Sequence, residues 1–380
     1  MSILSAVALS RAPVAAFMAV GFTWGCFAAM APVLKARIGV DDATFGLLLL
    51  ATAIGLTTTL YAAPRWDKAL GAFAMPLGTL MLGAMVFLPG WATTVPVFFG
   101  VLLLMGATSG LTDVVMNARV SEIEARTGRS LMNVNHAMFS VAYALSALLT
   151  GAMRELDWQP QAIFAVTALL VLSTAPFQKM AVQPVEEGPQ ASGGLPLGLV
   201  AICGAIVLIG FMAEATVEAW SALHIERTLG GGAAEGAFGP AMLGITMAIG
   251  RFSGQAVAAR FSELWVIRLA TGLAVVGVLI AATAPTPVVA YIGFGLQGLG
   301  ISVIGPMGLA LAGRLADASK RTAVIARVAV IGFTGFFIAP ALMGIGADTF
   351  GLRWAFASVA LLLAVIWPLS RSARVTPTHL

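Results

Sequence analysis

The sequence contains very little charge for its length. Only 10% of its 380 residues are Asp, Glu, Lys or Arg, whereas 59% are hydrophobic, and the mean hydropathy is +0.95. A water-soluble chain of this size could not cover its surface with so few charged side chains. The composition therefore excludes an ordinary soluble globular fold and predicts a protein whose surface faces lipid.

Reactive side chains are also scarce. The two cysteines, Cys26 and Cys203, both lie inside apolar stretches, and their spacing fits neither a disulfide framework nor a metal site. The three histidines, at His136, His224 and His379, are scattered along the chain. No nucleotide-binding loop follows a strand-like segment, and no Ser, His and Asp set shares one membrane depth. We therefore expect no enzyme, and neither a metal nor another cofactor.

Long apolar stretches dominate the sequence instead. A helix that crosses the roughly 30 Å hydrocarbon layer needs about 20 residues, because each residue adds about 1.5 Å. Twelve such stretches can be delimited between charged or turn-forming breaks. They are predicted at 12–34, 43–63, 70–88, 95–119, 131–153, 160–177, 196–223, 238–259, 265–284, 288–313, 322–346 and 352–369. We expect an all-α polytopic membrane protein with twelve transmembrane helices.

A polar linker at 179–195 divides these stretches into two sets of six. Its Pro, Gly and Glu content favours an extended, flexible tether. The two sets share short sequence echoes in the same order; Gly21–Phe22, for example, recurs as Gly210–Phe211. The sequence therefore predicts two pseudo-symmetric six-helix bundles, 1–178 and 196–380, related by an axis along the membrane normal.

The distribution of Lys and Arg predicts the orientation in the membrane. With the amino terminus inside, most basic residues fall in cytoplasmic loops. The outer side holds only Lys35, Arg37, Arg154, Arg227 and Arg353. This asymmetry predicts a multi-pass protein of a bacterial inner membrane with both termini cytoplasmic. The net charge of +4 then reports topology and not nucleic-acid binding.

This organisation resembles the major facilitator superfamily over essentially the whole chain. The signature of that superfamily, between the second and third helices, is Gly-x-x-x-Asp-Arg/Lys-x-Gly-Arg-Arg/Lys. Asp67 and Lys68 match its charged positions, and Gly250–Gly254 echoes the same element in the second half. The resemblance implies a monomeric transporter that works by alternating access of its two halves.

A narrower resemblance lies in the fourth and fifth helices. The segments Gly110–Asn117, Gly128–Met132 and His136–Ser140 resemble the fucose-permease-like branch of bacterial permeases. Members of that branch use an acidic group in the first helix, and this chain has none between Arg11 and Asp41. The resemblance therefore implies a permease without implying fucose as the solute.

Candidate solute-binding groups lie near the middle of the membrane. Counting about 1.5 Å per residue from each helix entry places Trp24 and Gln297 near the midplane, with Tyr143 at a similar depth. Trp24 could stack on the apolar face of a sugar while Gln297 and Tyr143 bond its hydroxyl groups. The alternative is an ordinary packed aromatic side chain and interhelical hydrogen bonds.

Glu214 and Glu218 are the candidates for proton coupling. They are four residues apart and therefore share one face of the seventh helix. Two carboxylates this close in a poorly hydrated cavity do not both ionise easily, so one of them is suited to carry a proton. Glu214 is the first choice. Glu218 is either a second coupling group or a solvated charge at the outer mouth.

Four further polar residues are predicted to serve gating or proton relay. Asp113 and Asn117 repeat the four-residue spacing on the fourth helix, and His136 could approach them from the adjacent helix as a relay, an inner gate or a structural clasp. Arg251 is a cation inside a span and needs a carboxylate or anion partner. We expect it to act in gating, or to bind an organic anion if it faces the cavity.

Together these features predict a proton-coupled symporter of a small polar solute such as a sugar or sugar derivative. Sodium is an alternative coupling ion. Two other functions fit the same sequence: an efflux antiporter for amphipathic compounds or organic anions, and a non-transporting membrane sensor with the same fold. The expected partners are the solute, the proton and the lipid bilayer, with no nucleic acid.

Overall fold

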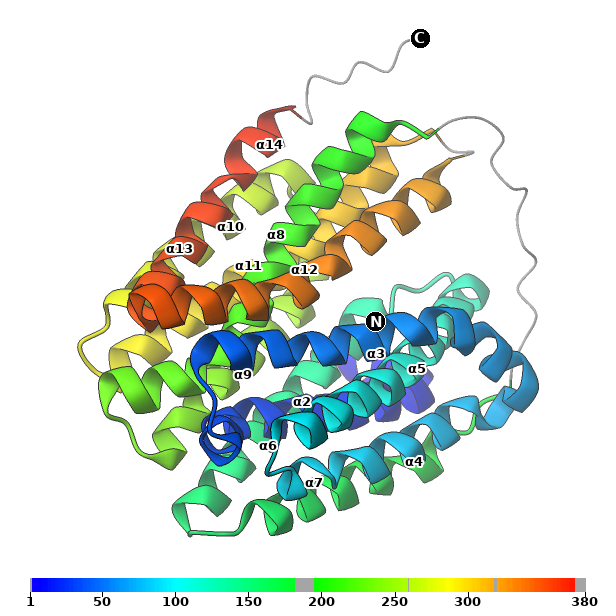
Figure 1. The fold of residues 1–380 in the computed structure, drawn as a ribbon. Helices are drawn as coiled ribbons and strands as arrows, with labels where there is room; N and C mark the ends of the chain where they lie inside the picture. Colours follow the sequence, from blue (N-terminus) through cyan, green and yellow to red (C-terminus); the bar gives the residue numbers. More distant parts are fainter. Residues whose placement is uncertain (1, 182–194, 259, 318–319, 373–380) are drawn as a thin grey trace.

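The computed structural model describes residues 2–181, 195–258, 260–317 and 320–372. These parts of the chain form helices and connecting turns, with no strand among them (Figure 1). The predicted all-α fold is thereby confirmed. Most of the predicted linker, 182–194, and the last residue of the predicted eighth span, 259, lie outside the described residues.

The helices follow one another with short connections. The amino-terminal half contains α1 (Ile3–Leu9), α2 (Arg11–Ile38), α3 (Asp42–Leu70), α4 (Ala74–Val86), α5 (Val95–Thr127), α6 (Met132–Glu155) and α7 (Pro160–Thr174), with short turns at Gly71–Phe73, Pro89–Trp91 and Ala175–Phe177. The carboxy-terminal half contains α8 (Leu197–Leu223), a π-helical turn at His224–Thr228, α9 (Ala233–Ala258), α10 (Glu263–Thr283), α11 (Pro287–Leu315), α12 (Arg321–Phe350), α13 (Leu352–Ala364) and α14 (Ile366–Ser372).

Eleven of the described helical segments are long and apolar enough to cross a membrane. The predicted eighth span corresponds to α9, which has 26 residues but is not one of the eleven. Glu235, Pro240 and Arg251 within α9 lower its hydropathy. Charged residues and a proline inside the helix therefore weaken its apolar signature without shortening it.

Helix boundaries are set by a few local signals. Gly39 and Gly128 end α2 and α5 in the left-handed conformation, at φ values of 68° and 63° that glycine adopts at little cost. Asp41 begins α3 by accepting a hydrogen bond from the backbone N–H of Thr44 at 2.6 Å. That hydrogen bond lowers the pKa of Asp41 below its ordinary value.

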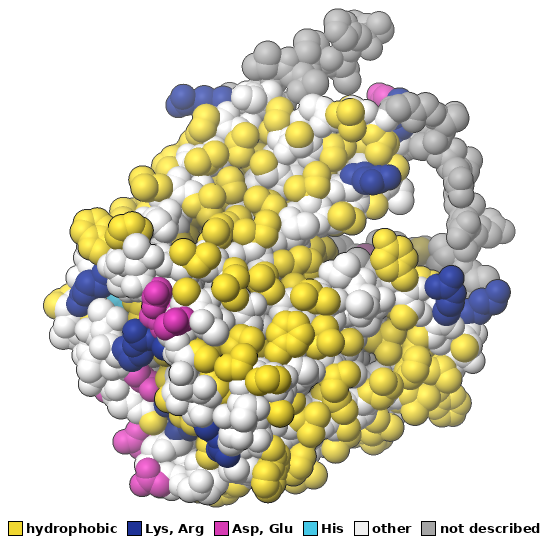
Figure 2. Space-filling view, in the orientation of Figure 1, with side chains coloured by type: hydrophobic (Ala, Val, Ile, Leu, Met, Phe, Trp, Pro, Cys, Tyr) yellow, Lys and Arg dark blue, Asp and Glu magenta, His cyan; other side chains and the backbone are white. Residues whose placement is uncertain are grey.

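The two halves meet at one end of the molecule and diverge toward the other. Between the halves, α6 packs along α9, α3 along α12, and α2 against α8. We call the end that holds residues 39–41, 156–159 and 229–232 the closed end, and the end at which α7 stops and α8 starts the linker end. Figure 1 shows the halves separating toward the linker end. Figure 2 shows hydrophobic side chains over most of one flank, with charged side chains gathered toward its ends.

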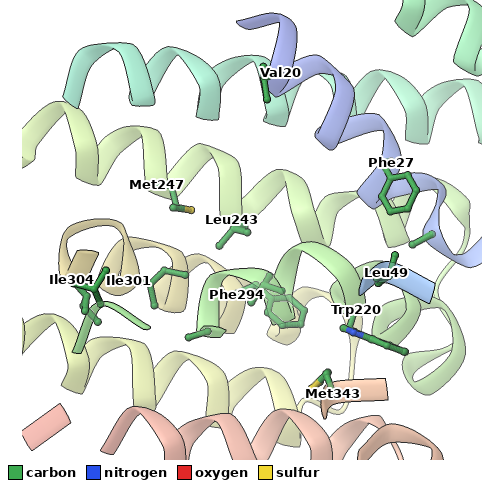
Figure 3. Close-up of a cluster of buried hydrophobic side chains, with 14 of the residues drawn as sticks. Val20, Phe27, Leu49, Trp220, Leu243, Met247, Phe294, Ile301, Ile304 and Met343 are labelled. Atoms are coloured by element: carbon green, nitrogen blue, oxygen red, sulfur yellow. The ribbon is translucent and has the colours of Figure 1, made fainter. Parts of the chain in front are cut away.

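A buried apolar cluster crosses between the halves toward the closed end (Figure 3). Leu49 of α3 and Phe27 of α2 belong to the same cluster as Trp220 of α8 and Met343 of α12. The ring of Phe45 meets Trp220 edge-on, with 5.9 Å between ring centroids. The halves are therefore held together here by apolar packing as well as by polar groups.

Glycine allows α3 and α12 to approach closely. A Cβ atom on Gly46 would lie 2.5 Å from the carbonyl oxygen of Pro340, and one on Gly344 would lie 2.5 Å from the carbonyl oxygen of Asp42. No side chain fits at either distance, so small residues set the spacing of these helices.

Candidate functional site

The centre of the molecule contains a buried ion pair. Arg251 of α9 donates from Nη2 to Oε1 of Glu214 on α8 at 3.1 Å, and the two side chains are only 11% and 6% exposed. A guanidinium inside a membrane span is costly unless a carboxylate balances it. The sequence assigned these two residues separate roles, in gating and in proton coupling, and the structure brings them together.

Arg251 also reaches the other half of the molecule. Its Nη1 donates to Oγ of Ser140 at 2.6 Å and to the backbone carbonyl of His136 at 3.3 Å, both on α6. The helices are close because α9 carries Gly244, where an added Cβ would lie 3.0 Å from the carbonyl oxygen of Ser140. One guanidinium thus joins a carboxylate of its own half to two acceptors of the other. Sequence reasoning placed Ser140 in a motif but gave it no role.

Glu218 and Tyr143 lie around this pair. Glu218 is half-buried and forms no hydrogen bond or ion pair with another described residue, but it is within electrostatic range of Glu214 and Arg251. Tyr143 of α6 is 2% exposed, and its hydroxyl has no hydrogen-bond partner among the described residues. A buried polar group without a partner is costly, so the Tyr143 hydroxyl is suited to bond a ligand.

The other two predicted solute-binding residues sit in different halves. Gln297 of α11 is fully buried and donates from Nε2 to the carbonyl of Ala213 at 3.2 Å, next to Glu214, while its Oε1 has no partner among the described residues. Trp24 of α2 is half-buried and donates from Nε1 to Oγ of Ser109 on α5 at 3.0 Å. The indole is therefore oriented by a hydrogen bond while part of its ring stays accessible.

The predicted meeting of His136 with Asp113 and Asn117 does not occur in this structure. Asn117 donates to the backbone carbonyl of Asp113 at 2.8 Å, within α5. The His136 ring packs edge-on against Phe17 of α2, with 4.8 Å between ring centroids. No hydrogen bond or ion pair joins His136 to Asp113 in the described part of the chain. The reason is the order of packing, because α2 contacts both helices and α5 hardly touches α6.

A second buried cluster, which sequence reasoning missed, lies at the linker end of α5. Arg119 is 1% exposed, bonds Oε1 of Glu122 at 2.6 Å and also pairs with Asp67 of α3. The sequence ended the predicted span 95–119 at Arg119 and placed Glu122 in a solvated cytoplasmic loop, but α5 continues through both to Thr127. The match of Asp67 to an acidic signature position was the available signal for this pairing.

Paired charges also close the opposite end of the molecule. Asp42 of α3 binds Arg227 of the π-helical turn in the other half, at 2.5 Å between Oδ1 and Nη1 and 3.0 Å between Oδ2 and Nη2. Lys35 lies 2.9 Å from the same Oδ1. Only 4% of the Asp42 side chain is exposed, so two cations share one largely buried carboxylate.

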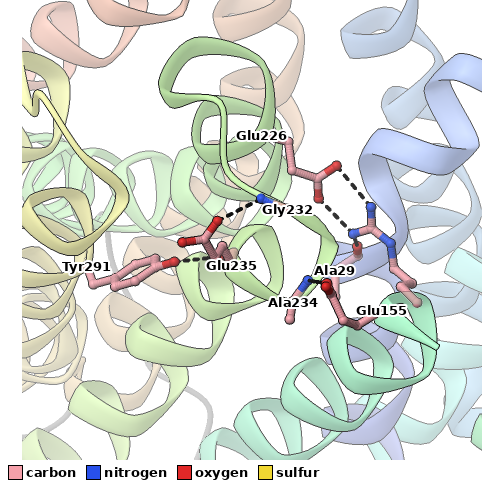
Figure 4. Close-up of polar contacts among 8 residues, drawn as sticks. Ala29, Glu155, Glu226, Gly232, Ala234, Glu235 and Tyr291 are labelled. Atoms are coloured by element: carbon pink, nitrogen blue, oxygen red, sulfur yellow. Dashed lines mark hydrogen bonds and ion pairs between the residues drawn. The ribbon is translucent and has the colours of Figure 1, made fainter. Parts of the chain in front are cut away.

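Two more links between the halves lie beside it (Figure 4). Arg154 of α6 binds both oxygens of Glu226 at 2.8 and 2.9 Å and donates to the carbonyl of Ala29 at 2.6 Å. Glu155 accepts from the backbone N–H of Ala234 at 3.1 Å. Asp42, Arg227, Lys35, Arg154 and Glu226 form what we call the closed-end cluster. The sequence used its cations only to predict orientation.

Comparison with known proteins agrees with this architecture. Residues 200–379 match the family model described as Major Facilitator Superfamily. The chain is 31% identical over 362 residues to an uncharacterised MFS-type transporter of Yersinia pestis, covering 92% of each chain. A bacterial homologue of the human lysosomal transporter Spinster, solved in an inward-facing, occupied conformation, has a TM-score of 0.79 at 13% identity and covers 97% of this chain and 96% of its own. A D-xylose–proton symporter has a TM-score of 0.74 at 13% identity, covering 97% and 98%.

Proposed function

The chain belongs to the major facilitator superfamily, and we propose that it is a secondary transporter that moves a small polar solute together with protons. The buried pair of Arg251 and Glu214 carries this proposal, because the same guanidinium also binds α6 of the opposite half. In transporters built from two repeated bundles, solute and coupling ion bind at the interface of the bundles near the midplane. A titratable group at that interface links protonation to the movement of the halves.

The coupling follows from charge balance. While Glu214 is ionised, it neutralises Arg251 and the pair is stable in a poorly hydrated site. When a proton neutralises Glu214, Arg251 keeps only the neutral acceptors on α6, the Ser140 hydroxyl and the His136 carbonyl. A buried charge that has lost its counter-ion is strongly destabilised. Solute oxygens that bind Arg251 relieve this cost, so proton binding favours solute binding.

The remaining predicted residues take supporting roles in this proposal. Tyr143 and Gln297 each offer a buried polar atom that no described residue bonds, and Trp24 offers a partly accessible ring for stacking. Glu218 is a second carboxylate beside the coupling pair. Asp113, Asn117 and His136 lie nearer the linker end and act in gating or proton relay.

The orientation and moving parts belong to the same proposal. The two bundles, 1–178 and 196–380, rock about the central site while the linker at 179–195 tethers them. The linker end faces the cytoplasm of a bacterial cell, with both termini inside. Symport of a polar solute is also supported by the D-xylose–proton symporter that shares the fold.

Proton movement in proteoliposomes tests this function. The full chain is reconstituted with a pH-sensitive dye and challenged with sugars, sugar acids and amphipathic cations. We expect one solute class to drive proton movement that Glu214→Gln abolishes. Glu263→Gln serves as the matched control, because Glu263 pairs with Arg314 at the surface, where half of the arginine side chain is exposed. Solute-driven proton movement that survives in Glu214→Gln contradicts the assignment of coupling to Glu214.

A further inference from the structure

We infer that the transported solute is a hydroxycarboxylate, whose carboxylate takes the place of Glu214 on Arg251 when Glu214 accepts a proton. This inference rests on the proposed function and specifies the solute class that the central site recognises. Three observations carry it: the N–H donors of the guanidinium that no described residue bonds, the balance of charges around it, and two buried polar atoms, on Tyr143 and Gln297, without a partner among the described residues.

The guanidinium of Arg251 has N–H donors left over for a second carboxylate. It offers five N–H donors in a planar fork that matches two carboxylate oxygens. Glu214 engages this fork through one oxygen only, at 3.1 Å from Nη2. The other contacts of Arg251, at Nη1, are to a hydroxyl and a backbone carbonyl. A carboxylate that approached in the plane of the fork would bind more tightly than Glu214 does.

The charges near Arg251 favour an anion over a neutral solute. The titratable and charged groups around it are Glu214 and Glu218 on α8, and His136 and Tyr143 on α6. With one glutamate ionised and the other protonated, the group is neutral. If Glu214 then takes a proton and a carboxylate takes its place, the net charge is unchanged. A proton carried with a neutral solute would instead leave an uncompensated guanidinium in the membrane, which is costly.

The two unpaired polar atoms specify the rest of the solute. The Tyr143 hydroxyl can donate to the second oxygen of the carboxylate. Gln297 bonds the carbonyl of Ala213, the residue before Glu214, and its Oε1 accepts only and therefore requires a donor such as a hydroxyl group. A carboxylate that carries a nearby hydroxyl meets both requirements.

Paired probes that differ only at the carboxylate test this inference. The purified full chain is titrated with D-gluconate against D-sorbitol, D-glucuronate against D-glucose, and L-lactate against propane-1,2-diol, with thermal unfolding as the readout. We expect at least one carboxylate to raise the melting temperature while its neutral counterpart does not. The affinity of the protein for this carboxylate should fall about tenfold for each unit of pH increase at pH values where Glu214 of the unliganded protein is ionised, because one proton binds with each carboxylate.

Variants separate this inference from general anion binding. Arg251→Gln should lower the affinity for the carboxylate by about ten- to a hundredfold, as expected for loss of hydrogen bonds to a charged group. Arg251→Lys, which keeps the charge but loses the planar fork of donors, should lower this affinity by about tenfold. Glu214→Gln should retain binding and remove its pH dependence. Arg314→Gln, at the surface, is the matched control and should bind as the native chain does.

The results of these binding and transport measurements separate the inferred solute class from the proposed proton coupling. Equal binding of a neutral counterpart, unchanged affinity in Arg251→Gln, or no response to any carboxylate in a cooperatively melting protein overturns the inference. Proton-coupled uptake of a neutral sugar would overturn it while leaving the proposed function intact. Arg251-dependent binding of a carboxylate without solute-driven proton movement would support the solute class and contradict the exchange with a protonated Glu214 and the proposed proton coupling.

Discussion

At the scale of single residues, Arg251 both pairs with a buried carboxylate and links the two halves of the molecule. Its guanidinium holds Glu214 in one half and Ser140 and the His136 carbonyl in the other. Because it has one ionic partner and two neutral ones, the protonation of a single carboxylate changes how it is held. The Arg251 side chain is therefore bonded to both halves of the molecule at once.

Loss of Arg251 should destabilise the protein in a pH-dependent way. In Arg251→Gln, ionised Glu214 is left buried without a cation, which costs about 3–5 kcal/mol. A protonated Glu214 is not penalised in this way, so the loss should shrink as the pH falls. Thermal unfolding across a pH series measures this. The double variant with Glu214→Gln should recover stability at high pH, and equal destabilisation at all pH values would contradict the buried pairing.

Removal of the Tyr143 hydroxyl should separate a binding role from a packing role. The hydroxyl has no partner among the described residues, so Tyr143→Phe should change the free energy of unfolding by less than about 1 kcal/mol. Solute affinity should nevertheless fall by about tenfold, because one hydrogen bond to the solute is lost. Equilibrium binding and chemical or thermal unfolding measure the two effects. Normal affinity with reduced stability would identify Tyr143 as a packing residue.

At the scale of helices, the closed-end cluster joins the two halves at one end of the molecule. Asp42 at the start of α3 and Glu226 in the π-helical turn each hold an arginine from the opposite half. These contacts must break for the closed end to open. The apolar cluster around Trp220 and the tight crossing of α3 on α12 must separate at the same time.

Neutralising Asp42 should shift the protein toward opening at the closed end. Asp42→Asn removes the carboxylate that Lys35 and Arg227 share, and the partly exposed Arg227 limits the effect to about 1 kcal/mol, or roughly fivefold in population. Distances between spin labels on α3 and α9 at that end report the population. Glu263→Gln, which removes a pair within one half, is the control and should leave the distances unchanged. An unchanged distribution in Asp42→Asn would show that the ion pairs do not hold this end shut.

At the scale of the whole molecule, the position of the basic residues predicts which end faces the cytoplasm. A Cys-less chain, made by replacing buried Cys26 and Cys203 with alanine, allows the orientation to be tested. A cysteine at exposed Leu156 of the closed end should react with an impermeant thiol reagent in intact cells. One at exposed Arg371 should react only after permeabilisation. The reverse pattern would contradict cytoplasmic termini.

The sequence was sufficient to predict the helices but not their partners. Apolar stretches locate spanning helices directly, because every backbone polar group in lipid must be bonded within the helix. Among the described helices that correspond to predicted spans, only α9 departed from this pattern, and Arg251 lies inside it. Intramembrane polar residues could likewise be identified, because each one is costly. That rule predicted a carboxylate or anion partner for Arg251 without identifying which group supplies it.

The pairings depend on how the helices pack, which chain order does not give. Adjacent α5 and α6 were expected to bring Asp113 and His136 together, but α2 separates them. The closed-end partners Asp42 and Arg227 are 185 residues apart, and Arg154 and Glu226 are 72 apart. The predicted span 95–119 ended at Arg119 without a partner for it, yet Arg119 is buried and pairs with Asp67 of α3.

The central claim, that Glu214 exchanges a proton beside Arg251, can be measured without knowledge of the solute. Infrared difference spectroscopy of the reconstituted chain at two pH values records the carboxylic-acid carbonyl band that appears when a carboxylate is protonated. We predict that the native chain and the Glu263→Gln control show a band that is missing from Glu214→Gln, and that Arg251→Gln changes its pH dependence. An identical carboxylic-acid band in the native chain and in Glu214→Gln would contradict the claim.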